Sequence, residues 1–226
     1  MISIVIPCYG RADMTAACLQ SIDENTRLDH ELVLVDNGSP DGETWDLIGQ
    51  TDCVSVFLSE NVNYGRGANI GAIASSGDLI VFLNNDTEVR AGWLEPLVDA
   101  FSDKEVGIAA GRLEDPDGTL QHAGVTLFMD RGTLTAANVT TEEPSRELDV
   151  VAGTAMMIRR ECFQSSGGHD PVYRNGYEDV DLCLRARAAG WKVRYCAESN
   201  VMHHKHQSGP SRWAYVREIT TSHDRP

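Results

Sequence analysis

The chain has 226 residues, a formal net charge of −15 and a hydrophobic fraction of 42%. This length suits one domain that buries its own core, and the composition is that of an ordinary globular protein. The negative charge argues against nucleic acid and against an anionic membrane surface as partners. A phosphorylated ligand would therefore need local positive charge, from a bound metal ion or from a few arginine side chains.

Membrane and export signals are missing from the sequence pattern. No run reaches the ~18 apolar residues that a membrane-spanning helix needs, and the first ten residues do not resemble a signal peptide. The six cysteines form no CxxC pair, which predicts reduced thiols rather than a disulfide framework or a zinc site. We expect a cytoplasmic protein, or one at the inner face of the membrane, with at most peripheral membrane association.

The first hundred residues alternate strand and helix signals. Short β-branched runs occupy residues 2–6, 31–35, 54–58 and 79–83, and helix-compatible segments lie near residues 12–22, 41–50, 66–75 and 92–102. This alternation predicts an α/β fold with a mostly parallel central sheet and helices on both faces. Ligands of such sheets bind beyond the carboxyl ends of the strands. Polar residues gather at those ends, at 7–9, 36–39, 61–64 and 84–87.

The second half is less regular. Strands are expected at residues 106–112, 120–128, 192–195 and 199–202, and a helix at 177–189 that Gly190 ends. The run 150–158 is apolar and is interrupted by Gly153-Thr154. The polar stretch 129–147 predicts a mobile loop, and residues 203–226 predict a loop or tail. Because neither an internal repeat nor a linker is evident, we expect one domain over residues 1–212 and a tail over 213–226.

Asp86 follows an apolar strand within the segment FLNNDT. A carboxylate at such a strand end can hold a divalent cation and the hydroxyl groups of a sugar. The alternative is a loop aspartate that only caps the next turn.

Glu178, Asp179 and Asp181 open the helix predicted at 177–189. Acidic residues in a first turn interact favourably with the helix dipole, which is sufficient reason for their presence. Three carboxylates within four residues also repel one another, which favours a functional role for at least one of them. A carboxylate placed there can accept a proton from an attacking hydroxyl group.

Two further motifs are ambiguous. His203, His204 and His206 follow the strand predicted at 199–202 and are either surface histidines or metal ligands. The glycine-rich segment 63–71 precedes a helix, but its spacing is neither GxGxxG nor that of a P-loop. Its glycines are equally explained by a tight connection between a strand and a helix.

Seven segments occur together in an order and spacing that resemble the family 2 glycosyltransferases of the GT-A fold. They are SIVIPCYGR, LVLVDNGSPDGE, NVNYGRGANIGAIASSGDLIVFLNNDTEV, DPDGTLQHAGV, GTAMMIRRECF, GYEDVDLCLRARAAGW and VMHHKHQSGPSR. The resemblance covers about residues 2–212 and is nearest to the bacterial branch that builds O-antigen and other surface polysaccharides, rhamnosyltransferases included. Many members of the family continue beyond this region with helices that help to form the acceptor site.

The resemblance implies a nucleotide-sugar site. Pro7 and Tyr9 would line the base and ribose pocket, and Asp36 would bind a uracil or thymine base. Asn84-Asn85-Asp86 stands where the family carries its Asp-x-Asp metal motif, so only Asp86 of this motif would bind Mn²⁺ or Mg²⁺ directly. The positions expected to contact the donor are Pro7, Tyr9, Asp36, Asn63, Arg66, Asn69, Asn84, Asn85, Asp86 and Glu178.

The same resemblance makes Asp179 the general base and His203 the second metal ligand, with His204 as an alternative. It implies an inverting transfer of sugar from a UDP- or dTDP-sugar to a saccharide or a lipid-linked saccharide. Two other readings stay open. One is a non-catalytic module that binds nucleotide-sugar or carbohydrate. It is supported by Asn84, which stands where the family motif has an acidic residue. The other is a nucleotidyltransferase. Such an enzyme would need a glycine-rich, basic segment after the first strand, and residues 7–13 contain just one arginine, which argues against it.

Overall fold

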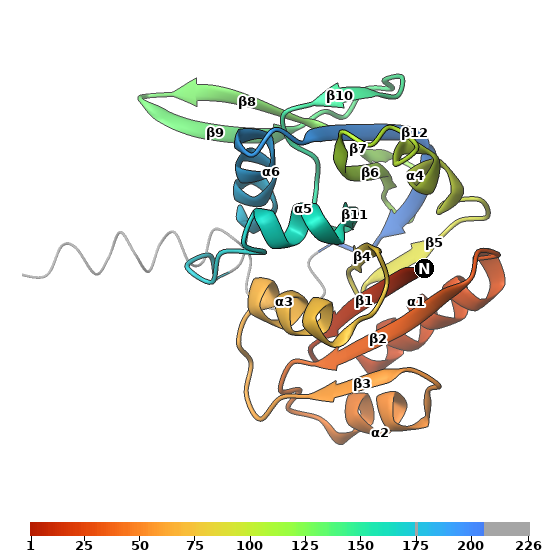
Figure 1. The fold of residues 1–226 in the computed structure, drawn as a ribbon. Coiled ribbons are helices and arrows are strands. Elements are labelled where there is room, and N and C mark those ends of the chain that lie inside the picture. The colour runs from red at the N-terminus through yellow and green to blue at the C-terminus, as the bar shows by residue number, and fades with distance from the viewer. Residues whose placement is uncertain (175, 206–226) are drawn as a thin grey trace, which may run out of the picture.

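The computed structural model describes residues 1–174 and 176–205, which form an α/β fold around a ten-stranded sheet (Figure 1). Within these residues the helices are α1 (Ala12–Asn25), α2 (Gly42–Gln50), α3 (Tyr64–Ala74), α4 (Glu95–Ala100), α5 (Arg160–Ser165) and α6 (Glu178–Ala188). The strands are β1 (Ile2–Cys8), β2 (His30–Asp36), β3 (Val54–Phe57), β4 (Leu79–Leu83), β5 (Thr87–Val89), β6 (Val106–Glu114), β7 (Leu120–His122), β8 (Val125–Asp130), β9 (Thr133–Asn138), β10 (Arg146–Leu148), β11 (Ala155–Arg159) and β12 (Lys192–His203).

The large sheet has the strand order β10-β12-β6-β11-β4-β1-β2-β3, with β5 paired to β12 and β7 paired to β6. The strands β4, β1, β2 and β3 run parallel to one another, and β12 runs parallel to β6. Between these two parallel groups, β11 is antiparallel to both β4 and β6. The sheet is therefore mixed, and its parallel half comes from the first part of the chain.

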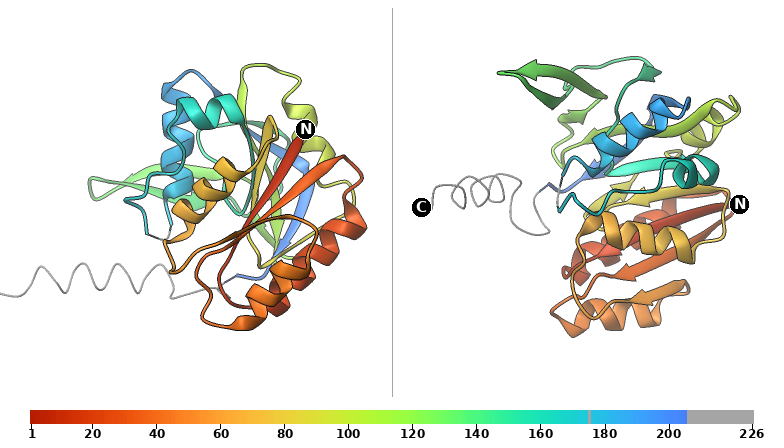
Figure 2. Two further views of the ribbon diagram at one scale, coloured as in Figure 1. Left: turned by 60° about the horizontal axis from the view of Figure 1, so that its bottom comes forward. Right: turned by 60° about the vertical axis from the view of Figure 1, so that its left-hand side comes forward.

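Helices cover both faces of the sheet, as predicted (Figure 2). On one face, Cys18 and Ile22 of α1, Ile48 of α2 and Leu97 of α4 join a core with alternate residues of the strands. On the other face, α3, α5 and α6 contribute the buried side chains Ala68, Ala72, Cys162, Phe163, Leu182 and Cys183. The nearly continuous apolar character of β1 follows from this arrangement, because both of its faces are buried.

The elements of the first hundred residues lie close to where the sequence predicts them. The fourth strand coincides with 79–83, and the other predicted strands and helices of this half differ by a few residues at their ends, which is where such predictions are weakest. The short strand β5 was not predicted. In the described residues no helix has the length and apolar character to cross a membrane. All six cysteines are unpaired. The predicted boundary between residues 1–212 and the tail lies outside the described residues.

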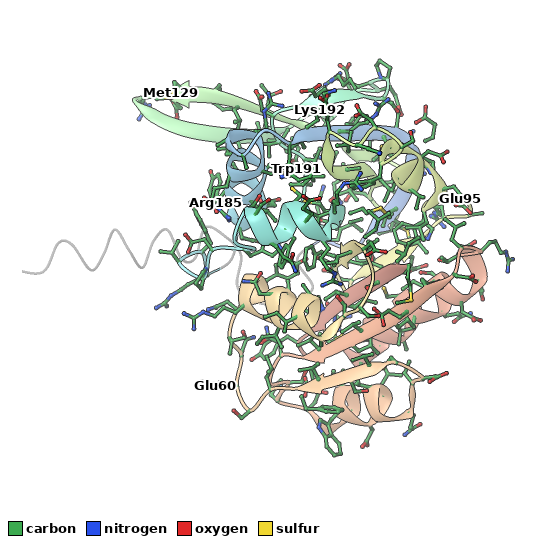
Figure 3. The ribbon with its side chains drawn as sticks, in the orientation of Figure 1. Glu60, Glu95, Met129, Arg185, Trp191 and Lys192 are labelled. Carbon is green, nitrogen blue, oxygen red and sulfur yellow. The ribbon has the colours of Figure 1, made fainter. Side chains whose placement is uncertain are left out.

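The stretch 129–147 was expected to be a loop, and this prediction was wrong. It contains β9 and β10, and β9 pairs with β8 as a hairpin that projects from the body of the domain, with Met129 near its tip (Figure 3). The two residues between the strands, Arg131 and Gly132, both have positive φ, at 48° and 84°. Tight hairpins require this conformation, but an Arg-Gly pair is a weak signal for it.

Two other predictions about strands need correction. The run 120–128 is divided into β7 and β8, because Gly124 has a φ of 111° and interrupts the extended chain. The segments 192–195 and 199–202 belong to one long strand, β12, whose pairing with β6 shifts between Cys196 and Asn200. Such irregularities let a strand continue while extra residues bulge out of the ladder.

Gly71 allows α3 to pack closely on the parallel strands. A Cβ atom at this position would overlap the Val5 side chain and lie 3.0 Å from Cγ2 of Val35. Alanine is favoured over glycine inside a helix by about 1 kcal/mol, but overpacking a core typically costs about 1–3 kcal/mol. We therefore predict that Gly71→Ala lowers the free energy of unfolding by about 1–2 kcal/mol in urea titrations.

Gly49 in α2 provides the matched control, because a Cβ atom there would meet no atom within 4 Å. Gly49→Ala should raise the free energy of unfolding by about 0.5–1 kcal/mol through helix propensity alone. Equal effects of the two substitutions would contradict the close packing of α3 on the sheet.

Candidate active site

The carboxyl ends of β1, β2 and β4 form one edge of the sheet. Cys8 lies opposite Asp36 in the register of β1 and β2, and Val5 of β1 lies opposite Phe82 of β4. The last residues of these three strands and the polar segments that follow them therefore meet at the same edge. They carry many of the residues expected to contact the donor: Pro7, Tyr9, Asp36, Asn84, Asn85 and Asp86.

The end of β12 reaches this edge from the other half of the sheet. His203 pairs with Thr87 of β5, and the main-chain N–H of His204 donates to the Asp86 carbonyl oxygen at 2.9 Å. This pairing places His203 Nε2 3.4 Å from Asp86 Oδ1. The His203 Nδ1 atom lies 2.7 Å from Oε1 of Gln121, at the opposite side of the ring.

Asp86 and His203 fit a site for a divalent cation. Asp86 Oδ1 is buried and has no hydrogen-bond partner among the described residues, so it has lone pairs available for a ligand. The described residues contain no group of three or more His, Cys, Asp or Glu side chains that could hold a metal ion. A cation here would thus take its other ligands from a diphosphate or from water, as Mg²⁺ often does in phosphate-binding sites.

The neighbouring histidines differ in what they contact. His204 Nε2 lies 2.8 Å from Oε1 of Glu88, so this ring turns away from Asp86 and pairs with another carboxylate. His206 lies outside the described residues. Between His203 and His204, His203 is the one with the geometry of a partner for Asp86.

Asp179 lies in the first turn of α6 and is held by main-chain N–H groups. Gly153 donates to Asp179 Oδ2 at 2.9 Å, and Val180 donates to Oδ1 at 2.8 Å. A Cβ atom on Gly153 would lie 2.9 Å from the Asp179 Cβ atom, so glycine is required for this approach. The next residue, Thr154, accepts a hydrogen bond from the main chain of Asn84 at 2.9 Å. The segment 153–154 thus connects the acidic end of α6 to the end of β4.

Asp181 takes part in a structural ion pair. Its carboxylate lies 2.6 Å from the Arg185 guanidinium one turn along α6. Arg185, labelled in Figure 3, also donates to the carbonyl oxygens of Ser166 and Gly168. These contacts fasten the segment before α6 to the helix, which gives Asp181 a role in holding the loop.

Tyr64 is a site residue that the sequence did not single out. Its hydroxyl oxygen is buried without a hydrogen-bond partner among the described residues, and its ring packs edge-on against His169, with centroids 6.1 Å apart. Burial raises the pKa of the Tyr64 hydroxyl, and the negative charges of Glu178, Asp179 and Asp86 raise it further. The hydroxyl therefore lies within electrostatic reach of both the predicted base and the predicted metal ligand.

Left-handed backbone conformations occur where three helices begin beside this edge. Arg11, Asn63 and Tyr177 immediately precede α1, α3 and α6 and have φ values of 54°, 70° and 69°. Such values are uncommon for residues other than glycine and cost about 1–3 kcal/mol each. Their concentration around the site is typical of functional regions, where a strained backbone is maintained by the surrounding structure.

The expected base pocket lies at the end of β2. Asp36 is 4% exposed, and its Oδ1 atom accepts the Ser39 N–H at 3.0 Å. Asn37 connects this turn to the segment before α3, because its side chain accepts the Val62 N–H and donates to the Asn63 carbonyl oxygen. Tyr9 is 36% exposed at the end of β1 and offers its ring to solvent.

Two predicted donor contacts already have partners within the protein. Both ends of the Asn69 amide bind the main chain of His169, at 2.8 and 2.9 Å. Asn85 is buried and donates to the Thr15 hydroxyl group of α1 at 3.0 Å. These two amides fix the loops around the site, whereas Arg66 is exposed on α3. Direct contact of the three residues with a nucleotide stays a prediction.

Comparison with known proteins identifies the family. The model for "Glycosyl transferase family 2" matches residues 3–167, which include the edge described above up to the segment before α6. The chain belongs to glycosyl transferase family 2. The predicted resemblance is therefore confirmed, and with it the GT-A fold.

The relatives of this family 2 chain include a protein named for O-antigen biosynthesis and a protein named as a rhamnosyltransferase. The O-antigen biosynthesis protein RfbC of Myxococcus xanthus is 34% identical over 92% of the chain, but the chain spans only 17% of that protein. The N-acetylglucosaminyl-diphospho-decaprenol L-rhamnosyltransferase of Mycobacterium tuberculosis is 27% identical over 92% of the chain and is covered to 78%.

The fold is also that of a structurally characterised enzyme. The crystal structure of GalNAc-T7 with UDP, GalNAc and Mn²⁺ superimposes with a TM-score of 0.76 at 19% identity, over 97% of this chain and 48% of that one. At this identity the comparison supports the fold of the family 2 domain.

The unpartnered hydroxyl group of Tyr64 leads to a prediction about stability. A buried polar group without a hydrogen bond typically costs about 1–3 kcal/mol, and phenylalanine has nearly the same shape without that group. Tyr64→Phe should therefore raise the free energy of unfolding of the ligand-free family 2 domain by about 1 kcal/mol in urea titrations.

Tyr9→Phe is the control for this substitution, because the Tyr9 side chain is partly in solvent and its hydroxyl group can bind water. We expect no measurable change in stability for that variant. A loss of stability in Tyr64→Phe would show that the Tyr64 hydroxyl group has a hydrogen-bond partner in solution.

Proposed function

We propose that this family 2 chain is an inverting, metal-dependent glycosyltransferase. It transfers a sugar from a UDP- or dTDP-sugar to a hydroxyl group of a saccharide or of a lipid-linked saccharide, in the synthesis of a surface polysaccharide. The observation that carries the proposal is the meeting of Asp86, His203 and Asp179 at one edge of the sheet, through the pairing of β5 with β12 and the contacts of segment 153–154.

The nucleotide would bind across the ends of β1 and β2. Asp36 accepts the imide N–H that uracil and thymine share, and Tyr9 and Pro7 line the base and ribose pocket. Asn63 and Arg66 lie at the start of α3, where the guanidinium group of Arg66 supplies positive charge for the phosphates in an otherwise acidic protein. The name of the Mycobacterium tuberculosis relative, a rhamnosyltransferase for N-acetylglucosaminyl-diphospho-decaprenol, supports a lipid-linked saccharide acceptor.

Asp86 and His203 would hold a divalent cation, Mn²⁺ or Mg²⁺, together with the diphosphate of the donor. When bound, such a cation stabilises the negative charge that develops on the departing diphosphate. Asp86 supplies a buried carboxylate oxygen and His203 supplies a ring nitrogen on the facing side. Asn84, Asn85 and Glu178 complete the wall of this pocket.

Asp179 would act as the general base. Its position in the first turn of α6 favours the ionised carboxylate through the helix dipole, and the N–H group of Gly153 fixes the orientation of the side chain. The carboxylate takes the proton of the acceptor hydroxyl while that oxygen attacks the anomeric carbon. Because the attack and the departure of the diphosphate occur in one displacement without a covalent intermediate, the anomeric configuration inverts.

The metal site is tested by nucleotide binding. Asp86→Ala and His203→Ala should each weaken the binding of UDP or dTDP in the presence of Mn²⁺ by at least about tenfold, while leaving binding in EDTA unchanged. His204→Ala is the matched control, because His204 pairs with Glu88 and should bind normally. Isothermal titration calorimetry measures all four proteins. A defect in His204→Ala with normal binding in His203→Ala would reverse the assignment.

The general base is tested by sugar transfer. Asp179→Asn keeps the size of the side chain but cannot take a proton, so transfer should fall by about 10²–10⁴-fold. Donor affinity should stay within about twofold of the wild type, because the substitution leaves the nucleotide contacts intact. Glu178→Gln should have a milder effect on transfer, since that side chain positions the substrate. Transfer from a radiolabelled donor is measured beside donor binding.

Full activity in Asp179→Asn would show that Asp179 is not the general base. A wild-type chain that binds donor but transfers to no saccharide or lipid-linked acceptor would instead favour the alternative function, a nucleotide-sugar-binding module. The anomeric configuration of the product, read by NMR, separates inversion from retention.

A further inference from the structure

Gln121 lies behind the proposed metal site and makes two hydrogen bonds with His203, one to its ring and one to its main chain. It belongs to β7, the strand that pairs with β6, and its side chain is 4% exposed. From the sequence, no role in the nucleotide-sugar site was expected for Gln121. Its contacts nevertheless determine which nitrogen of His203 faces Asp86.

The orientation of the Gln121 amide is fixed by its two other partners. Gln121 Nε2 donates to Asp115 Oδ1 at 2.9 Å and to the main-chain oxygen of His203 at 3.2 Å. Both partners are acceptors, so the amide nitrogen must lie on that side. A reversed amide would place its oxygen against two acceptors. The oxygen, Gln121 Oε1, is therefore the atom that lies 2.7 Å from His203 Nδ1.

This orientation fixes the tautomer of His203. Because Gln121 Oε1 can only accept a hydrogen bond, His203 Nδ1 must carry the proton and donate it. In the neutral imidazole the other nitrogen, Nε2, then has a free lone pair, and that atom lies 3.4 Å from Asp86 Oδ1. The nitrogen without a proton is thus the one on the side of the proposed metal ion.

A tight turn holds Gln121 in place. Between β6 and β7, the Asp115 N–H donates to the Thr119 carbonyl oxygen at 2.8 Å, and the Gly118 N–H donates back to Asp115 at 2.9 Å. The second carboxylate oxygen of Asp115 lies 3.1 Å from the Lys205 ammonium group, just beyond β12. The turn therefore holds the His203 ring through Gln121, and it holds the chain just after His203 through Lys205.

We propose that Gln121 is a positioning residue for the metal site: it holds the His203 ring in the Nδ1–H tautomer with Nε2 directed at Asp86, so that a divalent cation can bind between them. This inference rests on the proposed function, because it takes Asp86 and His203 as the metal ligands. Hydrogen bonds from the distal nitrogen of a metal-binding histidine typically account for about 10–100-fold in metal affinity.

The first experiment measures Mn²⁺ affinity by electron paramagnetic resonance, in the presence of UDP. Gln121→Met keeps the length of the side chain and removes both hydrogen-bonding groups, and we expect Mn²⁺ to bind about 10–100-fold more weakly. Gln20→Met on α1 is the matched control, because Gln20 is exposed and its side chain donates to Glu24 one helical turn away. Its Mn²⁺ affinity should equal that of the wild type.

The second experiment needs no substitution at Gln121 and so remains decisive if that variant does not fold. Long-range ¹H–¹⁵N correlation spectra of the wild type, in mildly alkaline buffer without metal, report the tautomer of each histidine. The signal of His203, assigned by its loss in His203→Ala, should show the Nδ1–H form. A His203 ring in the Nε2–H form would overturn the inference.

The outcomes separate the inference from the function on which it rests. If the wild type binds Mn²⁺ in the presence of UDP but Gln121→Met binds it equally well, the positioning role of Gln121 is wrong and the proposed metal site stands. If the folded wild type binds no Mn²⁺ with UDP, the proposed metal site itself is wrong, and the inference falls with it.

Discussion

The pairing of β5 with β12 is the constraint on which the site depends. It joins residues 86–89 to residues 200–204 by main-chain hydrogen bonds, among them the bond from the His204 N–H to the Asp86 carbonyl oxygen. These bonds fix the register of the two strands in the absence of a ligand. Side chains then alternate about the strand, and only one of the two adjacent histidines can face Asp86. His203 meets Asp86, whereas His204 meets Glu88.

The site also concentrates features that oppose stability. Asp86 Oδ1 and the Tyr64 hydroxyl group are buried without hydrogen-bond partners among the described residues, and Arg11, Asn63 and Tyr177 adopt left-handed conformations beside them. The cores on the two faces of the sheet are apolar and well filled, and they offset this cost. Polar groups that have no partner in the ligand-free protein are available to bind a substrate, which is consistent with a site that is formed before the donor arrives.

Much of the fold could be predicted because the first half of the chain repeats strong local patterns, with β-branched runs ended by turn residues. The hairpin of β8 and β9 could not, because its Arg131-Gly132 turn is an uncommon solution and β9, with the sequence TLTAAN, has few large apolar residues. For the site, Asp179 and Asp86 have clear acidic motifs. Gln121 has none, since its role depends on a turn between β6 and β7 and on a strand end more than 80 residues away in sequence, at His203.

The proposed function requires Asp86 and His203 to hold a metal ion beside the diphosphate of a nucleotide. A crystal structure of the chain with UDP and Mn²⁺, with data collected near the manganese absorption edge, would locate that ion. We predict one anomalous peak at coordination distance from both Asp86 Oδ1 and His203 Nε2, with the diphosphate on its open side and the base next to Asp36. A bound nucleotide whose manganese peak lies away from these two atoms, or a nucleotide bound elsewhere on the domain, would contradict it.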